Sequence, residues 1–372
     1  MGACQSVTSA ELGQSIRSVA GAVQSSYGFF NRKEELERLV RILDAEPLQI
    51  NVLLGPKDAG KSLLLTHLRE LWKSSAGRSA LAPLVIIDMR INDCSSPDAM
   101  AALLRTELGG WQKQVRDLLG RLSSSTRLTS SPSGKAVYDK ELDDLLGFME
   151  GMTKQTGRAH VVMASSDEFF RSWLRRKFAD GKFKTIGLGL FCEDEAKQFF
   201  SEHVAPTLGL KLPQDWEATV WPSIFEAAGG SPYQLKTLAL NASLDNDEDA
   251  TNLVAQAQDL IDVARVNLEM TMGLGEGWTP AELTGIFKAI VEGGGAAAYR
   301  TVVAEVFGGQ IHHGNRVVHQ QLVRSNIIHV RLLTKATKYR DVPAQHTATG
   351  EYLMATSPAA YAAMKLCCDV LT

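Results

Sequence analysis

Apolar and polar positions alternate along the chain in a way that predicts helices and short buried strands. Residues 31–44 have apolar side chains at helical spacing, and Asn31 is the expected N-cap of this helix. A buried strand is expected at 50–55, a helix from residue 61, and a second buried strand within 82–90. Strand, glycine-rich loop, helix and strand form a βαβ unit, which predicts a parallel sheet.

The pattern continues with a helix over 97–122, a Ser/Thr-rich stretch at 123–134, and a helix over 140–157 that ends at Gly157. A third strand is expected at 158–166. The later expected segments are a helix at 167–180, an apolar segment at 183–190, a helix from residue 192, an acidic linker at 243–250, a Gly-rich turn at 293–295 and a C-terminal segment at 350–371.

The loop after the first strand, "GPKDAGKSLLL", matches the phosphate-binding pattern G-x-x-x-x-G-K-S in full. Its glycines let successive backbone N–H groups converge on phosphate oxygens, and the following helix adds its positive N-terminal dipole. Lys61 is expected to reach the β- and γ-phosphates, and the Ser62 hydroxyl to bind Mg²⁺. The residues expected to contact a nucleotide here are Gly55, Pro56, Lys57, Asp58, Ala59, Gly60, Lys61, Ser62 and Leu63.

Hydrolysis of a bound nucleotide requires an acid at the end of a neighbouring strand, which completes the Mg²⁺ site. Asp88, which follows the apolar run "LVII", is the first candidate. Met89 and Arg90 come next, so no adjacent Glu is present to polarise a water molecule. The alternative is that Asp88 only caps a core strand.

Several motifs together resemble the archaeal-type ATPase group of the AAA+/STAND P-loop NTPases. These motifs are "FFNRKEELERL", "VIIDMR", "HVVMASSD", "IGLGLFCEDEAKQFF" and "AAGGSPYQLKTLAL", and the C-terminal "GEYLMATSPAAYAAMK" resembles a winged helix. The resemblance implies that Arg32 lies on the adenine side and that Ser165 or Ser166 reads the γ-phosphate. ATP and Mg²⁺ are the implied cofactors.

The resemblance also implies the domain organisation. An α/β core with a parallel sheet flanked by helices is followed by a helical lid and a C-terminal winged-helix-like domain. The expected boundaries are a flexible tail at 1–26, the P-loop NTPase core at 27–205, the lid at 206–272 and the winged-helix-like domain at 273–372.

One part of the family pattern is missing from the sequence. Between the second strand and the sensor strand, the family carries a third strand that ends in Asp-Glu, whereas residues 122–150 here contain no apolar run before an acidic pair. Asp143 and Asp144 fall within a helical pattern. Asp88 and Asp167 remain as substitute acids. Loss of this strand would leave unpaired backbone groups in the sheet unless another segment took its place.

Basic residues concentrate near the C-terminus, where 306–340 contains no Asp or Glu. In a winged helix, "NRVVHQQLVRSNII" would be the recognition-type helix and "TKATKYR" the wing, so Arg316 and Arg324 could hold DNA phosphates. The alternative is a packing or protein-binding module, which the formal net charge of −3 favours. Arg175 and Arg176 could act on a neighbouring subunit's nucleotide or belong to a charged helix surface.

Five cysteines without metal-ligand spacing predict neither a disulfide framework nor a zinc site. No apolar run is long enough to span a bilayer. The expected location is cytoplasmic, with an organelle not excluded. Peripheral membrane attachment would follow only if Gly2 and Cys4 of "MGACQS" were acylated, and that short pattern also arises by chance.

Three functional hypotheses follow. The first is an ATP-binding switch with weak or absent hydrolysis, in which Lys61 and Ser166 respond to the γ-phosphate. The second is an ATPase that uses Asp88 as its catalytic and metal-binding acid. The third is a winged-helix module for DNA or protein with a vestigial nucleotide site. Expected partners are a nucleotide and either a protein or a second copy of the chain; nucleic acid is possible but less favoured.

Overall fold

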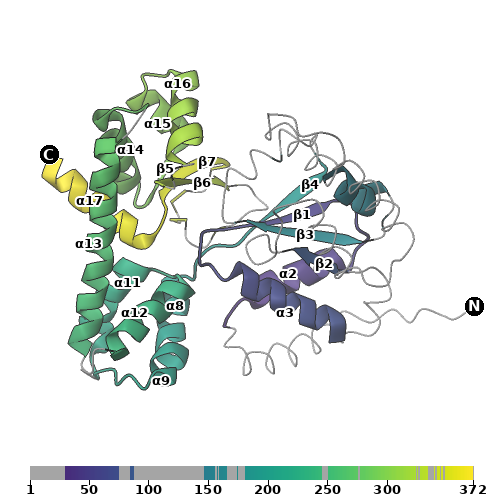
Figure 1. Cartoon of the computed structure of the whole chain (residues 1–372), viewed down its shortest axis with the longest axis horizontal. Coiled ribbons are helices and arrows are strands. Elements are labelled where there is room, and N and C mark those ends of the chain that lie inside the picture. Colours follow the sequence, from purple (N-terminus) through teal and green to yellow (C-terminus); the bar gives the residue numbers. More distant parts are fainter. Residues whose placement is uncertain are drawn as a thin grey trace, which may run out of the picture. The chain divides into compact units, whose positions relative to one another are not determined.

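The protein is described by a computed structural model, shown in Figure 1. The described residues are 30–74, 84–87, 146–155, 157, 159–165, 174, 181–244, 250–274, 277–323, 325, 327–333, 339, 342–343, 345–346 and 348–371. They divide into two compact units. The first comprises described residues within 1–53, 61–165 and 173–185, and the second those within 54–60, 166–172 and 186–372. The helices expected at 97–122 and 167–180 lie largely outside the described residues.

Four strands form a parallel sheet, as the βαβ pattern predicted. They are β1 (Ile50–Leu54), β2 (Leu84–Ile87), β3 (His160–Ser165) and β4 (Phe183–Gly187), in the order β2-β3-β1-β4. Backbone hydrogen bonds from Ile50 to Lys182 and from Leu188 to Leu54 show that β1 and β4 run in the same direction. Every residue of β1 is buried, including Asn51, and its other four residues are apolar, as in a strand covered on both faces.

The second strand fills the position that the missing strand was expected to leave open. β2 pairs with β3 in parallel, with Leu84 opposite His160 and Ile87 opposite Met163. β2 is thus the segment that takes the place of the missing strand beside β3, which is the alternative that the sequence left open. The described part of this strand, Leu84–Ile87, lies within the expected 82–90 segment.

Helices α2 (Lys33–Leu43) and α3 (Lys61–Ser74) pack against each other, and Figure 1 shows them on one face of the sheet. Helix α2 buries four residues at helical spacing: Leu36, Leu39, Val40 and Leu43. The expected N-cap is wrong by one residue. Arg32 occupies the N-cap position, whereas Asn31 has a φ of 42° in the left-handed region. The predicted stop at Gly157 is confirmed, with a φ of 59° and a hydrogen bond to the Thr153 carbonyl.

The sheet buries a histidine at the start of β3. The His160 side chain is 3% exposed, and its ring meets the edge of Trp72 at a centroid distance of 5.8 Å. Desolvation lowers the pKa of His160 to about 4, although the nearby Asp44 charge and the Leu43 backbone oppose this shift. The ring is therefore neutral at pH 7 and serves as part of the core.

The second unit begins with a group of helices packed around aromatic side chains. The helical segments are α8 (Glu193–Phe199), a π-helical turn at Phe200–Val204, α9 (Ala205–Thr207), α10 (Trp216–Thr219), α11 (Trp221–Ala228) and α12 (Pro232–Leu244). Phe200, Trp216, Trp221 and Phe225 form successive ring contacts with centroids 5.6–6.0 Å apart. These contacts anchor α11 to the preceding helices.

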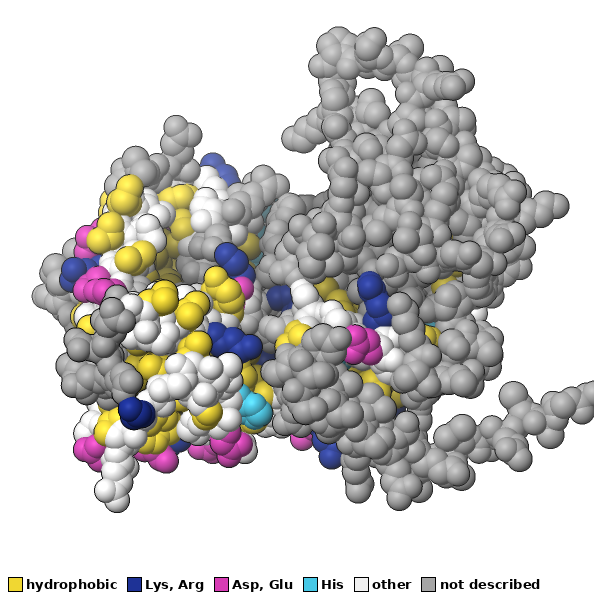
Figure 2. Space-filling view, turned by 60° about the horizontal axis from the view of Figure 1, so that its bottom comes forward, with side chains coloured by type: hydrophobic (Ala, Val, Ile, Leu, Met, Phe, Trp, Pro, Cys, Tyr) yellow, Lys and Arg dark blue, Asp and Glu magenta, His cyan; other side chains and the backbone are white. Residues whose placement is uncertain are grey.

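A 25-residue helix, α13 (Ala250–Leu274), contacts α11, α12, α14 and the C-terminal helix α17 (Pro358–Leu371). Its described surface residues Val263, Val266 and Met270 are exposed. Figure 2 shows hydrophobic side chains interspersed with charged ones over the described part of the second unit. None of the described helices is long and apolar enough to cross a membrane.

The C-terminal part of the second unit agrees with the winged-helix-like order expected from sequence. The elements are α14 (Pro280–Glu292), β5 (Ala296–Ala298), α15 (Tyr299–Val306), α16 (Ile311–Asn315) continued by a π-helical segment (Arg316–Leu322), β6 (Ile328–Leu333), β7 (Gly350–Ala355) and α17. The strands form an antiparallel sheet in the order β5-β7-β6. Its core includes Ile286, Phe287, Ile290, Val317, Val318, Leu322, Ile328 and Leu353.

Candidate functional site

The glycine-rich loop lies between the end of β1 and the start of α3. Residues 55–60 form the loop, and the helix begins at Lys61, as the sequence pattern predicted. Asp58 and Gly60 both have left-handed backbone conformations, with φ values of 66° and 84°. Positive φ values in such a loop turn backbone N–H groups toward one side, which produces a concave anion-binding nest.

The two motif glycines are required for different physical reasons. Gly60 has open space around its Cα, but its φ of 84° is strained for any residue with a side chain. Gly55 does not have a positive φ; instead, a Cβ at this position would collide with the backbone carbonyl of Leu188. Conformation therefore selects glycine at position 60, and lack of space selects it at position 55.

The remaining loop residues differ in their exposure. Pro56 and Ala59 are buried, Lys57 is exposed, and Ser62 and Leu63 are half-buried in the first turn of α3. Lys61 is 4% exposed. A buried ammonium group at the first turn of the helix, directly after a backbone nest, suits a phosphate group that approaches the loop.

Arg32, which the family resemblance assigns to the adenine side, is 3% exposed at the N-cap of α2. Its guanidinium group forms an ion pair with the Glu35 carboxylate at 3.2 Å. The structure thus shows Arg32 at the N-cap of α2, paired with a residue of the first turn. The contact of Arg32 with a nucleotide stays a prediction.

The candidate acidic and sensor residues directly follow two adjacent strands in the sequence. Asp88 follows Ile87, the last residue of β2, and Ser166 follows Ser165, the last residue of β3. Asp88, Ser166 and Asp167 themselves lie outside the described residues, as do Gly2, Cys4, Asp143, Asp144, Arg175 and Arg176. In a parallel sheet the carboxyl ends of the strands meet at one edge, where α/β proteins bind ligands. Within the described part of the chain, no group of three or more His, Cys, Asp or Glu side chains forms a metal cluster.

The sequence reasoning missed a backbone segment that contacts the loop. Leu188 to Phe191 connect β4 to α8, and the Leu188 N–H donates to the Leu54 carbonyl at 2.7 Å. At the other end of this segment, the Phe191 N–H donates to the Gly230 carbonyl at 2.9 Å. The only sign of this contact in the sequence is the glycine pair Gly229–Gly230 before Pro232. The structure is needed to show that Gly230 contacts Phe191.

The basic stretch near the C-terminus is divided between surface and core. Arg331 and His329, which belong to the acid-free stretch 306–340, are 2% and 6% exposed in β6, so they are not available on the surface. Arg331 packs over the Tyr339 ring at 5.4 Å. Arg316 is exposed, whereas Arg324, Lys335, Lys338 and Arg340 lie outside the described residues.

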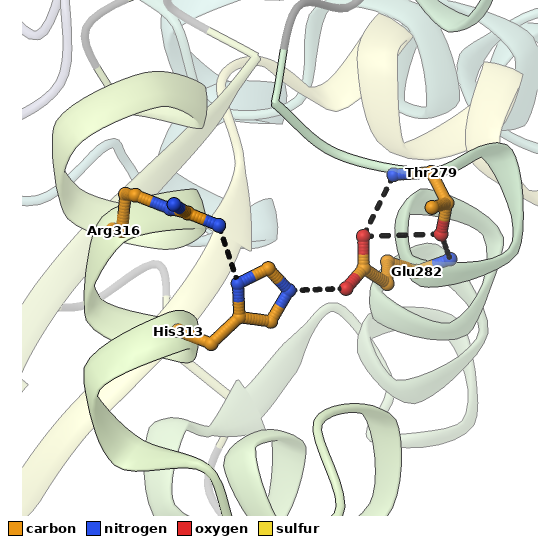
Figure 3. Close-up of polar contacts among 4 residues, drawn as sticks. All are labelled: Thr279, Glu282, His313 and Arg316. Carbon is orange, nitrogen blue, oxygen red and sulfur yellow. Dashed lines mark hydrogen bonds and ion pairs between the residues drawn. The ribbon is translucent and has the colours of Figure 1, made fainter.

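Arg316 belongs to a hydrogen-bonded group that Figure 3 shows. Thr279 and Glu282 form a capping box at the start of α14, and the other Glu282 oxygen contacts the His313 Nε2 at 2.5 Å. The Arg316 Nη2 lies 2.9 Å from the His313 Nδ1. If Nε2–H donates to the carboxylate, then Nδ1 accepts from the guanidinium group.

The ionisation of Glu282 reflects this environment. Burial opposes the charged form, but hydrogen bonds from the Thr279 backbone and from the His313 and Thr279 side chains, together with the His313 charge, outweigh it and lower the pKa of Glu282. The carboxylate is therefore ionised at neutral pH and holds α14 to the helix that carries His313.

Comparisons with known proteins were made by sequence and by structure. No protein-family model matches the chain, and a search of curated proteins gives no match. Among solved structures, the Aeropyrum pernix ORC1 protein in complex with DNA is 11% identical, with a TM-score of 0.43, over 91% of this chain and 93% of that chain. The Aeropyrum pernix ORC2 protein (ADPNP–ADP complexes) is 14% identical, with a TM-score of 0.46, over 91% and 94%.

Drosophila ORC bound to DNA is 11% identical, with a TM-score of 0.41, over 98% of this chain and 95% of that chain. Identities this low and TM-scores below 0.5 leave the assignment of function to the residues of the chain itself.

Proposed function

We propose that the chain is an ATP-binding protein of the AAA+/STAND type that acts as a nucleotide-dependent switch. The observation that carries this proposal is the backbone between β1 and α3. Asp58 and Gly60 are left-handed, a Cβ at Gly55 would not fit, and the helix begins at a buried Lys61. This geometry fits a phosphate group better than it fits an ordinary connection between a strand and a helix, which would need neither the glycines nor the buried lysine.

Each part of the loop has a distinct role in this proposal. The loop N–H groups and the α3 dipole hold the phosphate oxygens, Lys61 neutralises their charge, and the Ser62 hydroxyl binds Mg²⁺. When bound, MgATP supplies a triphosphate whose γ-phosphate distinguishes it from ADP. Ser166, directly after β3, senses that group and biases the helices that follow β4.

The test is a binding measurement with the full chain and MgATP. Lys61→Ala should weaken binding at least about tenfold, because it removes a charge-assisted contact worth about 1.5–3 kcal/mol. Lys288→Ala is the matched control, since Lys288 is an exposed lysine 3.8 Å from Glu292 on α14. If the folded wild-type chain binds neither ATP nor ADP in calorimetry, the proposal is wrong.

A second candidate function is ATP hydrolysis with Asp88 as the acid. The observation that favours it is the direct pairing of β2 with β3, because Asp88 then directly follows the strand beside the sensor strand. The resemblance places an acidic strand between the second and sensor strands. In this chain β2 pairs with β3 in that position, and Asp88 directly follows Ile87, the last residue of β2, in the sequence. Asp88 would complete the Mg²⁺ site with Ser62.

Hydrolysis is tested by phosphate release from MgATP. Asp88→Asn should reduce turnover to the background rate while MgATP binding falls much less, since Lys61 and the loop remain. Asp259→Asn, an exposed aspartate on α13, is the control and should leave turnover unchanged. If the wild type releases phosphate no faster than Lys61→Ala does, hydrolysis is excluded, and the nucleotide-dependent switch is the remaining candidate function.

A further inference from the structure

The segment Leu188–Phe191 is fixed to the chain at both ends by backbone hydrogen bonds. Leu188 bonds to Leu54, which directly precedes the phosphate loop, and Phe191 bonds to Gly230, which directly precedes Ser231 and helix α12. The side chains of Leu188 and Phe191 are 0% and 5% exposed. All of these residues belong to the second unit. The segment therefore forms a short, buried connection between the phosphate loop and the turn that joins α11 to α12.

Both ends of the connection depend on a glycine that lies against backbone. A Cβ at Gly55 would overlap the Leu188 carbonyl, and a Cβ at Gly230 would overlap the backbone of Phe191. Neither glycine has a positive φ, so space and not conformation excludes a side chain. Backbone atoms have no rotamers with which to absorb a displacement, so a shift at one contact is transmitted to the next.

The neighbouring Gly229 extends these contacts to the C-terminal helix. It has a φ of 51° and ends α11, with its N–H donating to the Phe225 carbonyl at 2.8 Å. A Cβ at Gly229 would collide with the ring of Pro358, the first residue of α17. Helix α17 packs against α11, α13 and α14. The two adjacent glycines thus lie between the Phe191 backbone and the first turn of α17.

We propose that these residues, namely Gly55, Leu188–Phe191, Gly229 and Gly230, form a glycine linkage that couples nucleotide binding at the phosphate loop to the start of α17. Phosphate binding shifts or stiffens the backbone at Gly55. The backbone contacts of Leu188–Phe191 pass this change on to Gly230, and the adjacent Gly229, which packs against Pro358, passes it on to the first turn of α17. Gly230 is in this sense a positioning residue for the phosphate loop. The inference rests on the proposed function, because it requires that the loop binds MgATP.

The experiment measures two quantities on the full chain: MgATP affinity, and the effect of MgATP on hydrogen exchange in the first turn of α17. In the wild type, MgATP should slow exchange there. Gly230→Ala should weaken MgATP affinity about five- to tenfold and abolish the effect on α17, a coupling of ordinary allosteric size. Gly209→Ala is the control, since Gly209 has a φ of 68° and a Cβ added there would meet no atom within 4 Å; it should change neither quantity.

A second variant covers the case in which Gly230→Ala does not fold. Pro358→Ala removes the far contact of the linkage, so MgATP affinity should stay within about twofold while the effect on α17 falls by at least half. If the wild type binds MgATP but exchange in α17 does not change, the linkage is wrong and the proposed function stands. If the wild type binds no nucleotide, the proposed function fails and the linkage fails with it. Equal effects of Gly230→Ala and Gly209→Ala would also overturn the linkage.

Discussion

The phosphate loop and the Thr279–Glu282–His313–Arg316 group place charged or polar groups at the start of a helix in different ways. The loop forms its concave surface from backbone, with left-handed conformations at Asp58 and Gly60 and a buried lysine at the first turn of α3. The C-terminal group uses side chains that hydrogen-bond to one another, from the Thr279 cap through Glu282 and His313 to Arg316.

The difference separates a site that is shaped for a ligand from a network that holds its own domain together. Left-handed residues in a short loop before a helix form the kind of backbone concavity that binds anions. The carboxylate of Glu282 already accepts from three donors, and His313 already contacts Arg316. We therefore place nucleotide binding at the loop and assign the C-terminal group mainly to domain stability.

The comparison is tested most strongly by straining both regions in the same way. Gly60→Ala forces an alanine into a φ of 84°, which should cost about 1–3 kcal/mol of unfolding free energy. MgATP affinity should also fall about ten- to a hundredfold, because misdirected N–H groups lose charge-assisted hydrogen bonds. Calorimetry and denaturant unfolding measure the two effects.

The matched control for this change is Gly308→Ala in the C-terminal domain. Gly308 has a φ of 57°, and a Cβ added there would meet no atom within 4 Å, so alanine at this position imposes a similar backbone strain. It should lower stability by a similar amount without any change in MgATP affinity. A comparable loss of affinity in both variants would show that general destabilisation, and not the loop geometry, controls binding.

Acid should affect the parallel sheet and the C-terminal group in different pH ranges. The pKa of His160 is lowered to about 4 by burial, so the unfolded chain binds the extra proton first, and stability is lost as pH falls from about 6.5 to 4. The full effect is about 3 kcal/mol. His160→Gln should flatten this part of the stability curve, as followed by urea unfolding at each pH.

The pKa of Glu282 is also lowered, but for an acid this shift has the opposite sign. Its contribution is present above the unfolded pKa near 4.5 and is lost as pH falls below that value through the folded pKa. The parallel sheet should therefore weaken at a higher pH than the start of α14. Simultaneous loss of both at one pH, seen by hydrogen exchange, would contradict this order.

The smallest expected effect concerns the capping box itself. Thr279→Ala removes the hydroxyl that accepts from the Glu282 N–H, and it should lower stability by about 1 kcal/mol. Glu282→Gln should lower stability by a similar amount, because it replaces the charged carboxylate that contacts the His313 ring. Glu292→Gln at the exposed end of the same helix is the control and should change little. Thermal unfolding measures all three, and MgATP affinity should stay constant throughout.

Local sequence patterns predicted the phosphate loop well because its conformation depends on nearby residues. The spacing of Gly55, Gly60, Lys61 and Ser62 defines a strand, loop and helix that the structure contains at these positions. Local reasoning failed at Asn31, since the alternatives at a helix start differ by little energy and Arg32 became the N-cap. Burial of Arg331 could not be read from a count of basic residues, because β6 turns this side chain toward the core.

Strand order and the glycine linkage could not be predicted from the sequence because both depend on contacts between residues far apart in the chain. The pairing of β2 with β3 depends on residues far apart in the chain, and nothing local to "LVII" specifies the neighbour of that strand. Likewise, the sequence shows Gly229 and Gly230 only as two adjacent glycines in the motif "AAGGSPYQLKTLAL". Their need for space follows from Pro358 and Phe191, which approach from distant parts of the chain.

The length of α13 has a mechanical consequence. With 25 residues at about 1.5 Å each, the helix is a rod about 37 Å long. Helices α11 and α12 contact it, and so do α14 and α17. For a rod of this length, a tilt of about 5° at one end displaces the other end by about 3 Å. A rotation of this size in the helices beside the glycine linkage would thus displace the far end of α13 by about 3 Å.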